Sequence, residues 1–419
     1  MRYEERMNID ERRKYLHKMR IRYWQTQSKK GRSELLNEME AVTELHRKSL
    51  IRLINGELAR KPRRKQRGKR YDGEVKAVVQ VIAESLDYPC AERLQPNLVW
   101  MAKHLIRHGE LHTRPGVLEK LGKVSVSTLW RLLPRSQQRS RLAHRKQRPG
   151  MSAPLRQAVP VRRIPWEETQ AGHFEVDLVH HCGLSTEGQY VHTLQLVDVS
   201  SGWSECVAIL GRSYLVMEDA FQRILNRLPF PVLELHPDNG AEFFNRFLLK
   251  FWKDKIKGVQ LSRSRPFQKN DNRFVEENNF SLVRAYIGYQ RLDTVQQTKH
   301  LNQLFDLLWL YHNFFQPVMR LTDKIPTTNP LRNKRIYDQA QTPFDRLGVK
   351  GVLTPGQMHQ LRDLREATNP CALRRMIETL TNQLFTLPTA RQDVTEDVRQ
   401  TLGLWQPAKL PMEISRHAL

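Results

Sequence analysis

A short apolar run that leads to an acidic residue is the sequence feature that most constrains this chain. Residues 231–235 read Pro-Val-Leu-Glu-Leu and predict a buried strand bounded by turn residues. Asp238 follows, then Asn239-Gly240, a pair that favours a sharp turn, and residues 241–257 carry helical spacing. Because open α/β sheets bind ligands at the carboxyl ends of their strands, Asp238 is a candidate site residue. The alternative is that Asp238 only caps the following helix.

A second predicted strand, at residues 173–179, also carries acidic residues. Its alternation places Glu175, Asp177 and Val179 on one face. An acid in the middle of a strand is costly unless something positive meets it. Both acids therefore require a positive partner, and Glu175 is either a supporting or solvated acid or, as the alternative, a metal contact.

Residues 264–278 lead into a predicted helix that begins with two adjacent glutamates. Glu276 shares helical spacing with three apolar positions, whereas Glu277 shares it with polar ones. The apolar positions are Phe280, Val283 and Ile287. We therefore expect Glu276 to face the sheet and Glu277 to face water.

Together these stretches resemble the Asp-Asp-Glu core of transposases and retroviral-type integrases. The resemblance is carried by the motifs Glu175-x-Asp177, His236-Pro-Asp238-Asn-Gly-x-Glu-Phe243 and Lys269-Asn-Asp-Asn-x-x-Val-Glu276. The last motif is similar to one group of bacterial insertion-sequence transposases. In that group the Val-Glu pair is usually followed by Gln-Lys-Asn, whereas this chain has Glu277-Asn278-Asn279. The resemblance implies an α/β ribonuclease H-like catalytic core, a mixed sheet flanked by helices.

The resemblance also implies a metal-dependent reaction on a phosphodiester. Two divalent cations about 4 Å apart can clamp the attacking and leaving oxygens of such a group. Hard cations such as Mg²⁺ take oxygen ligands and keep several waters, so three carboxylates suffice. We expect Asp177 to bridge two Mg²⁺ ions and Asp238 and Glu276 to complete one each, with Mn²⁺ able to substitute. Lys269 is expected either at the DNA backbone near the scissile bond or in a solvated loop.

Composition points to a polyanionic partner. The 419 residues carry a formal net charge of +25, with 27% charged residues, and the pI is about 10.1. Double-stranded DNA is the partner that this surplus favours. We expect no membrane span and no signal peptide. The four cysteines lack metal-binding spacing, so we expect reduced thiols and a cytoplasmic, nucleoid-associated protein.

The amino-terminal part predicts DNA-binding elements. Residues 1–58 are expected to form a helix-turn-helix domain closed by Gly56, although generic three-helix bundles share this pattern. Residues 59–71 form a basic linker arm, which is also compatible with a merely solvated linker. Residues 72–134 predict a second helix-turn-helix-like domain, with Ser125 as an N-cap. The expected DNA contacts are His46, Arg47, Lys48, Arg52, Arg63, Arg64, Lys65, Arg67, Ser127, Thr128 and Arg131.

The remaining chain divides into three parts. Residues 135–165 predict an extended basic connector, 166–290 the catalytic domain, and 291–419 a mostly helical carboxyl-terminal region. Three strands, then a helix, then alternating strands and helices are expected in the catalytic domain. The expected strands lie at 174–180, 190–198, 203–210, 231–235 and 259–262, with a helix at 214–228. Asp198 lies before Ser200-Ser201-Gly202 and is expected to serve a turn.

These patterns predict a DNA transposase that cleaves at transposon ends and joins them to target DNA. Because two ends must be joined together, we expect a homodimer or a larger homo-oligomer. One alternative is a ribonuclease H-like nuclease that only cuts, but two DNA-reading domains argue against it. The other is a non-catalytic DNA-binding protein derived from a transposase, against which the presence of all three acids argues.

Overall fold

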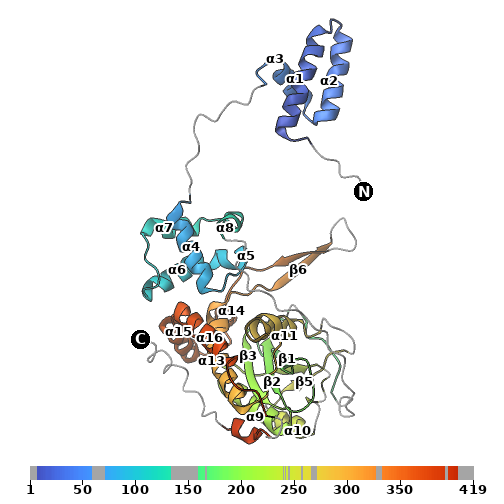
Figure 1. Cartoon of the computed structure of the whole chain (residues 1–419). Coiled ribbons are helices and arrows are strands. Elements are labelled where there is room, and N and C mark those ends of the chain that lie inside the picture. Colours follow the sequence, from blue (N-terminus) through green and yellow to red (C-terminus); the bar gives the residue numbers. More distant parts are fainter. Residues whose placement is uncertain are drawn as a thin grey trace. The chain divides into compact units, whose positions relative to one another are not determined.

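A computed structural model describes most of the chain in two compact units, Met1–Arg70 and Tyr71–Leu419 (Figure 1). The described residues are 7–58, 71–133, 159–165, 168–238, 240, 242–243, 246–255, 258–265, 271–326, 333–391 and 395–403. Within these ranges, no helix is both long enough and apolar enough to cross a bilayer.

The first unit is a bundle of three helices, α1 (Ile9–Gln25), α2 (Lys29–Thr43) and α3 (Arg47–Asn55). Polar residues cap each start: the side chains of Asn8, Ser28 and His46 each accept a backbone N–H of the first turn. Gly56 ends α3, as expected. The buried apolar residues are Leu16, Met19, Leu36, Met39, Leu50, Ile54 and Leu58.

The second unit begins with short helices that pack against its carboxyl-terminal part. They are α4 (Gly73–Ser85), α5 (Ala91–Leu94), η1 (Gln95–Asn97), α6 (Leu98–Arg107), α7 (Pro115–Gly122) and α8 (Val126–Leu132). The Tyr311 hydroxyl donates to the Ser85 carbonyl at 2.8 Å, and the ring Nε2 of buried His104 lies 2.9 Å from the Thr368 carbonyl. These helices therefore share one core with residues more than 200 positions later.

A mixed five-stranded sheet forms the centre of the second unit. Its strands are β1 (His173–His180), β2 (Val191–Asp198), β3 (Ser204–Leu210), β4 (Glu234–Pro237) and β5 (Gln260–Leu261). Their order is β3-β2-β1-β4-β5, in which β1, β2 and β3 pair antiparallel while β4 runs parallel to both β1 and β5. The expected order of three strands, a helix and then alternating strands and helices is confirmed.

Helices flank this sheet, and one of them closes its β3 edge. These helices are α9 (Tyr214–Arg227), α10 (Arg246–Lys255) and α13 (Val295–Phe315). On α13, the Asn302 amide bonds to both the N–H and the carbonyl of Ala208, at 2.8 and 2.9 Å. Asn313 makes the same pair of bonds to Ser204, at 2.9 and 3.0 Å. Side chains thus replace a sixth strand, which satisfies edge groups that would otherwise be open for pairing.

A buried carboxylate ties this edge to the core. Both indole N–H groups of Trp203 and Trp309 donate to Glu205 Oε1, at 2.9 and 2.7 Å, and Arg227 Nε donates to Oε2 at 2.6 Å. The Trp203 ring also packs edge-on against Trp309 and Phe314, with centroids 5.5 and 5.7 Å apart. The three donors compensate for burying the charge of Glu205.

The carboxyl-terminal region is not helical throughout. α13 ends at Phe315, because Gln316-Pro317 follows and proline cannot continue a helix. A two-stranded ribbon comes next, although the sequence pattern predicts helix to about residue 331. The ribbon is β6 (Leu321–Pro326) and β7 (Asn333–Tyr337), and α14 (Pro343–Lys350), α15 (Pro355–Ala367), α16 (Pro370–Leu384) and η4 (Val398–Thr401) complete the described chain.

The four cysteines are free, as expected for reduced thiols. Cys182 and Cys206 are buried, Cys371 is partly buried and Cys90 is exposed. Burial raises the pKa of the Cys206 thiol well above its usual range.

Candidate active site

Two of the expected acids follow from adjacent parallel strands. The register of β1 and β4 pairs Glu175 with His236 and Val176 with Pro237. The next residue on each chain segment is Asp177 and Asp238, respectively. The sheet therefore brings these two carboxylates to the same place, at the carboxyl end of β4 and on the central strand β1.

Asp177 is held in a fixed orientation by two hydrogen bonds. The Leu178 N–H donates to its Oδ1 at 2.8 Å, and the Asn279 side-chain amide donates to its Oδ2. Burial raises the pKa of Asp177, the two hydrogen bonds and His180 oppose that rise, and the Glu242 carboxylate adds to it. Burial is the largest of these causes, so the surroundings of Asp177 disfavour its charged form.

Glu242 is the carboxylate near this site that the sequence reasoning missed. A side-chain carbon placed on Gly240 would lie 2.6 Å from Glu242 Oε1 and 2.9 Å from Asp238 Oδ1. Asp238 also accepts the Gly240 N–H at 2.7 Å. Glu242 therefore returns toward Asp238, and a side chain at position 240 would require the ends of these two acids to shift. The spacing Asp238-x-Gly240-x-Glu242, a turn after a strand, is the signal that could have identified it.

The third expected acid lies on α11 (Arg273–Asn278). Both Glu276 and Glu277 are exposed, so the expectation that Glu276 faces the sheet is wrong. The buried position in this helix is Val275, the preceding residue. After Asn278 the chain continues as a π-helical segment, η3 (Asn279–Arg284), whose wider turns change the spacing on which the expectation relied.

Glu175 connects β1 to the helix that carries Glu276. Its Oε2 accepts the N–H groups of Phe274 and Val275, at 2.7 and 3.0 Å, so it caps the start of α11. The side chain is fully buried, which excludes the solvated-acid interpretation, and burial raises its pKa to about 7. Neighbouring Asn278 fixes the other end of α11 by donating to the Ser204 hydroxyl at 2.8 Å.

The described acids do not form a closed metal cage. No three His, Cys, Asp or Glu side chains within the described ranges are grouped so that they could hold a metal ion. Asp177 and Asp238 are neighbours through the sheet, whereas the helix that carries Glu276 is tied to the sheet through its backbone. Lys269 lies outside the described residues.

Asp198 serves a turn, as expected. Its carboxylate accepts the Ser201 N–H and hydroxyl, at 2.7 and 2.6 Å, and the Gly172 N–H at 2.7 Å. These bonds close the β2–β3 connection and hold the start of β1. Asp198 is therefore occupied by structural contacts.

A cavity of about 310 Å³ lies on the other side of α11 and does not include the candidate acids. Its lining includes Arg93, Glu277 and Arg320, and Arg93 Nη2 lies 3.5 Å from Glu277 Oε1. Glu277, rather than Glu276, therefore faces this hollow.

The expected DNA contacts of the first unit lie on and before α3. Lys48 and Arg52 are exposed, and His46 caps the helix by accepting the Lys48 N–H at 3.2 Å. Arg47 instead folds back onto α2, where it donates to the Asn37 side chain and, at 2.6 Å, to the Ser33 hydroxyl. Its guanidinium stabilises the bundle, and the contact of α3 with DNA stays a prediction.

On α8 the three expected contacts form one group. Ser127 and Arg131 are exposed, and Arg131 Nη2 donates to the Thr128 hydroxyl at 3.3 Å. Ser125 caps the helix, as expected. The four arm residues Arg63, Arg64, Lys65 and Arg67 lie outside the described residues.

Comparisons with known proteins add one family relationship. No family model matches the chain. The catalytic core domain of BIV integrase is similar with a TM-score of 0.30 and 16% identity, over 43% of this chain and 97% of that one. The uncharacterized protein y4rM of Sinorhizobium fredii (strain NBRC 101917 / NGR234) is 34% identical over 305 residues, which are 73% of this chain and 86% of that protein. The chain therefore belongs to the same family as y4rM.

Proposed function

We propose that this protein is a DNA transposase of the integrase type, which cleaves at the ends of a mobile element and joins them to target DNA. The observation that carries the proposal is the sheet register, which continues directly into Asp177 and Asp238 on adjacent parallel strands. The bonds from Glu175 to α11 support it, since they hold the Glu276 helix against the same strand.

The donor set fits a hard divalent cation. Asp177, Asp238 and Glu276 offer only carboxylate oxygens, which Mg²⁺ and Mn²⁺ prefer. Burial, with a smaller contribution from the Glu242 carboxylate, raises the pKa of Asp177, and a bound cation would favour its charged form. We propose the three acids as metal ligands because of this donor chemistry and because of the order of the strands that carry them. When bound, divalent cations would stabilise the charge that develops on the scissile phosphate.

Residues of the chain itself would position the reacting groups. Asn279 and the Leu178 N–H fix both oxygens of Asp177, and the Gly240 N–H fixes one oxygen of Asp238. Held in this way, the carboxylates keep one orientation through cleavage and joining. A water would attack the element end first, and the freed 3′-hydroxyl would then attack target DNA in line.

Partners follow from the same proposal. Duplex DNA is the proposed substrate, with exposed Lys48 and Arg52 on α3 and Ser127 and Arg131 on α8 as proposed contacts. A recognition helix that is capped at a fixed angle can present side chains to base edges. Because two ends are joined together, we propose that the active form is a homodimer or a larger homo-oligomer.

Amide substitutions test the catalytic assignment. Asp177→Asn, Asp238→Asn and Glu276→Gln should each lower cleavage and joining of the element's terminal DNA by at least about a hundredfold, as loss of one charge-stabilising group does. DNA binding should persist. The matched control is Glu277→Gln, an equally exposed neighbour on the same helix. Cleavage by Glu276→Gln but not by Glu277→Gln would show that Glu277, rather than Glu276, is the third catalytic acid.

The same assay separates the rival functions. Cleavage by the unaltered protein without any joined product would identify a nuclease. Binding of terminal DNA with neither product, in Mg²⁺ or Mn²⁺, would identify a non-catalytic DNA-binding protein.

A further inference from the structure

The ribbon β6–β7 is built almost entirely from exposed residues and projects from the second unit (Figure 1). Of its described positions, only Leu321 and Ile336 are partly buried. Even the apolar side chains Ile325 and Tyr337 are 46% and 44% exposed. An isolated two-stranded ribbon is marginally stable at best, so burial does not explain why the chain keeps this one.

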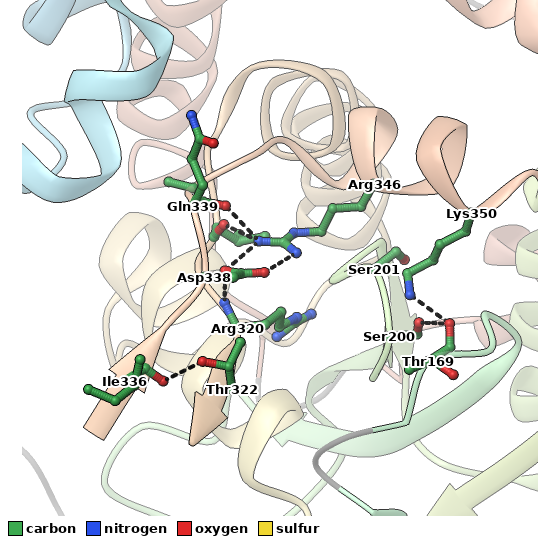
Figure 2. A network of polar contacts seen from close by, with 12 residues as sticks. Thr169, Ser200, Ser201, Arg320, Thr322, Ile336, Asp338, Gln339, Arg346 and Lys350 are labelled. Carbon is green, nitrogen blue, oxygen red and sulfur yellow. Dashed lines mark hydrogen bonds and ion pairs between the residues drawn. The ribbon is translucent and has the colours of Figure 1, made fainter. Parts of the chain in front are cut away.

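The base of the ribbon is firmly attached, as Figure 2 shows. Asp338 accepts the Arg320 N–H at 2.7 Å, and its own N–H donates to the Arg320 carbonyl at 3.0 Å. Arg346 on α14 bonds to Asp338 Oδ2 at 2.6 Å and to the Val318 carbonyl at 2.8 Å. The direction of the ribbon is therefore set by the unit, although its strands are not covered.

Positive charge lies on both faces of the ribbon. The register places Lys324 directly opposite Arg335, so their side chains share one face. Lys334 pairs with Ile325 on the other face. Like charges directly opposite one another do not stabilise a strand pair, so this arrangement does not serve to hold the ribbon together.

The side chains of Lys334 and Arg335 make no ion pair with the described residues. By contrast, Arg227 and Arg346 both bind carboxylates. Asp323 is the only acid among the described ribbon residues. The two cations are exposed on the ribbon surface.

We propose that the ribbon is a docking element for double-stranded DNA. The major groove admits a two-stranded ribbon, and cations on both faces would reach the phosphates along both walls of the groove. Tyr337, two residues after Arg335 on the same face, adds an exposed ring beside the charge. The choice of DNA as the polyanion rests on the proposed function.

Salt-dependent binding by the full chain tests this docking role. The double variant Lys334→Gln/Arg335→Gln should lower the slope of log affinity against log salt by about 1.8, since each phosphate contact contributes about 0.9. The matched control, Lys103→Gln/Arg362→Gln, removes the same charge from exposed positions on α6 and α15 and should keep the original slope. The probe is a duplex of random sequence, and thermal unfolding should be the same for all three proteins.

An unchanged slope for the ribbon variant, or an equal loss in both variants, would overturn the docking role. Measuring DNA cleavage by the unaltered protein alongside the salt slope separates this proposal from the catalytic one. If the unaltered protein never cleaves DNA but still shows the ribbon-dependent slope, the function proposal fails and the ribbon proposal stands. If it cleaves and joins DNA with a slope indifferent to the ribbon, the reverse holds.

Discussion

The five-stranded sheet and the two-stranded ribbon treat charge in opposite ways. Every residue of β2 and β3 is buried, and the acids among them are matched by indole, hydroxyl or guanidinium donors. In the ribbon nearly every residue is exposed, and Lys334 and Arg335 have no ion pair with the described residues. In the sheet, buried charge fixes geometry, whereas in the ribbon the charge is exposed.

The difference shows which changes each region should tolerate. A charge in the sheet is part of a set of hydrogen bonds, so removing one partner leaves another buried and uncompensated. A charge on the ribbon is solvated, so removing it should change binding while the fold stays the same. Three measurements test this difference between the sheet and the ribbon.

The largest difference is expected between two single variants, one that removes a buried aromatic ring and one that removes an exposed ring. Trp203→Ala removes a fully buried ring and one of the donors to Glu205, and should lower the free energy of unfolding by about 3–5 kcal/mol. Tyr337→Ala on the ribbon should change it by less than about 0.5 kcal/mol. Chemical denaturation of both variants measures this. A comparable loss from Tyr337→Ala would show that the ribbon is part of the core.

An intermediate effect is expected from pH. Burial beside β3 lowers the pKa of His312 to about 4, below the unfolded value of about 6.5. The unfolded chain therefore binds a proton first, so the stabilisation present above pH 6.5 is lost as the pH falls toward 4. For one such group, the free energy of unfolding falls by at most about 1.4 kcal/mol for each pH unit in this interval.

The measurement compares the free energy of unfolding at pH 7 and pH 5. His312→Gln should lose roughly 2 kcal/mol less than the unaltered protein over this interval. The ribbon variant Asp323→Asn is the control and should follow the unaltered protein. Parallel pH profiles for His312→Gln and the unaltered protein would contradict the assignment of His312 as a buried neutral side chain.

The smallest effect is expected at Glu175. Glu175→Ala removes the acceptor for the Phe274 and Val275 N–H groups, and loss of a helix cap costs about 0.5–2 kcal/mol. Hydrogen exchange at these two amides should accelerate in Glu175→Ala and far less in Glu175→Gln, which keeps a side-chain oxygen. Unchanged exchange in both variants would mean that the start of α11 is held by other contacts.

Much of the sheet was predictable because its signals are local. Apolar runs bounded by turn residues predicted strands at 190–198 and 203–210, and the structure has Val191–Asp198 and Ser204–Leu210. The helix expected at 214–228 is Tyr214–Arg227. The turn role of Asp198 was predictable for the same reason, since its partner Ser201 lies three residues away.

What the sequence pattern missed has no regular apolar spacing that would reveal it. The orientation of Glu276 was wrong because a π-helical segment follows it, and regular spacing does not reveal that segment. Glu242 was missed because its approach to Asp238 depends on how the chain returns past Gly240. The ribbon was missed because Leu-Thr-Asp-Lys-Ile-Pro buries too little apolar surface to produce a strand pattern.

Arg320 gives the ribbon a mechanical connection to the candidate active site. Its backbone begins the ribbon, its guanidinium donates to the Asp198 carbonyl at 3.3 Å, and the same group lies 4.4 Å from the centre of the Phe274 ring. Asp198 ends β2, and Phe274 lies in the first turn of the Glu276 helix. Because one side chain contacts both the end of β2 and α11, a movement of the ribbon base would displace both elements. A bound duplex that moves the ribbon would thereby also move the helix that carries Glu276.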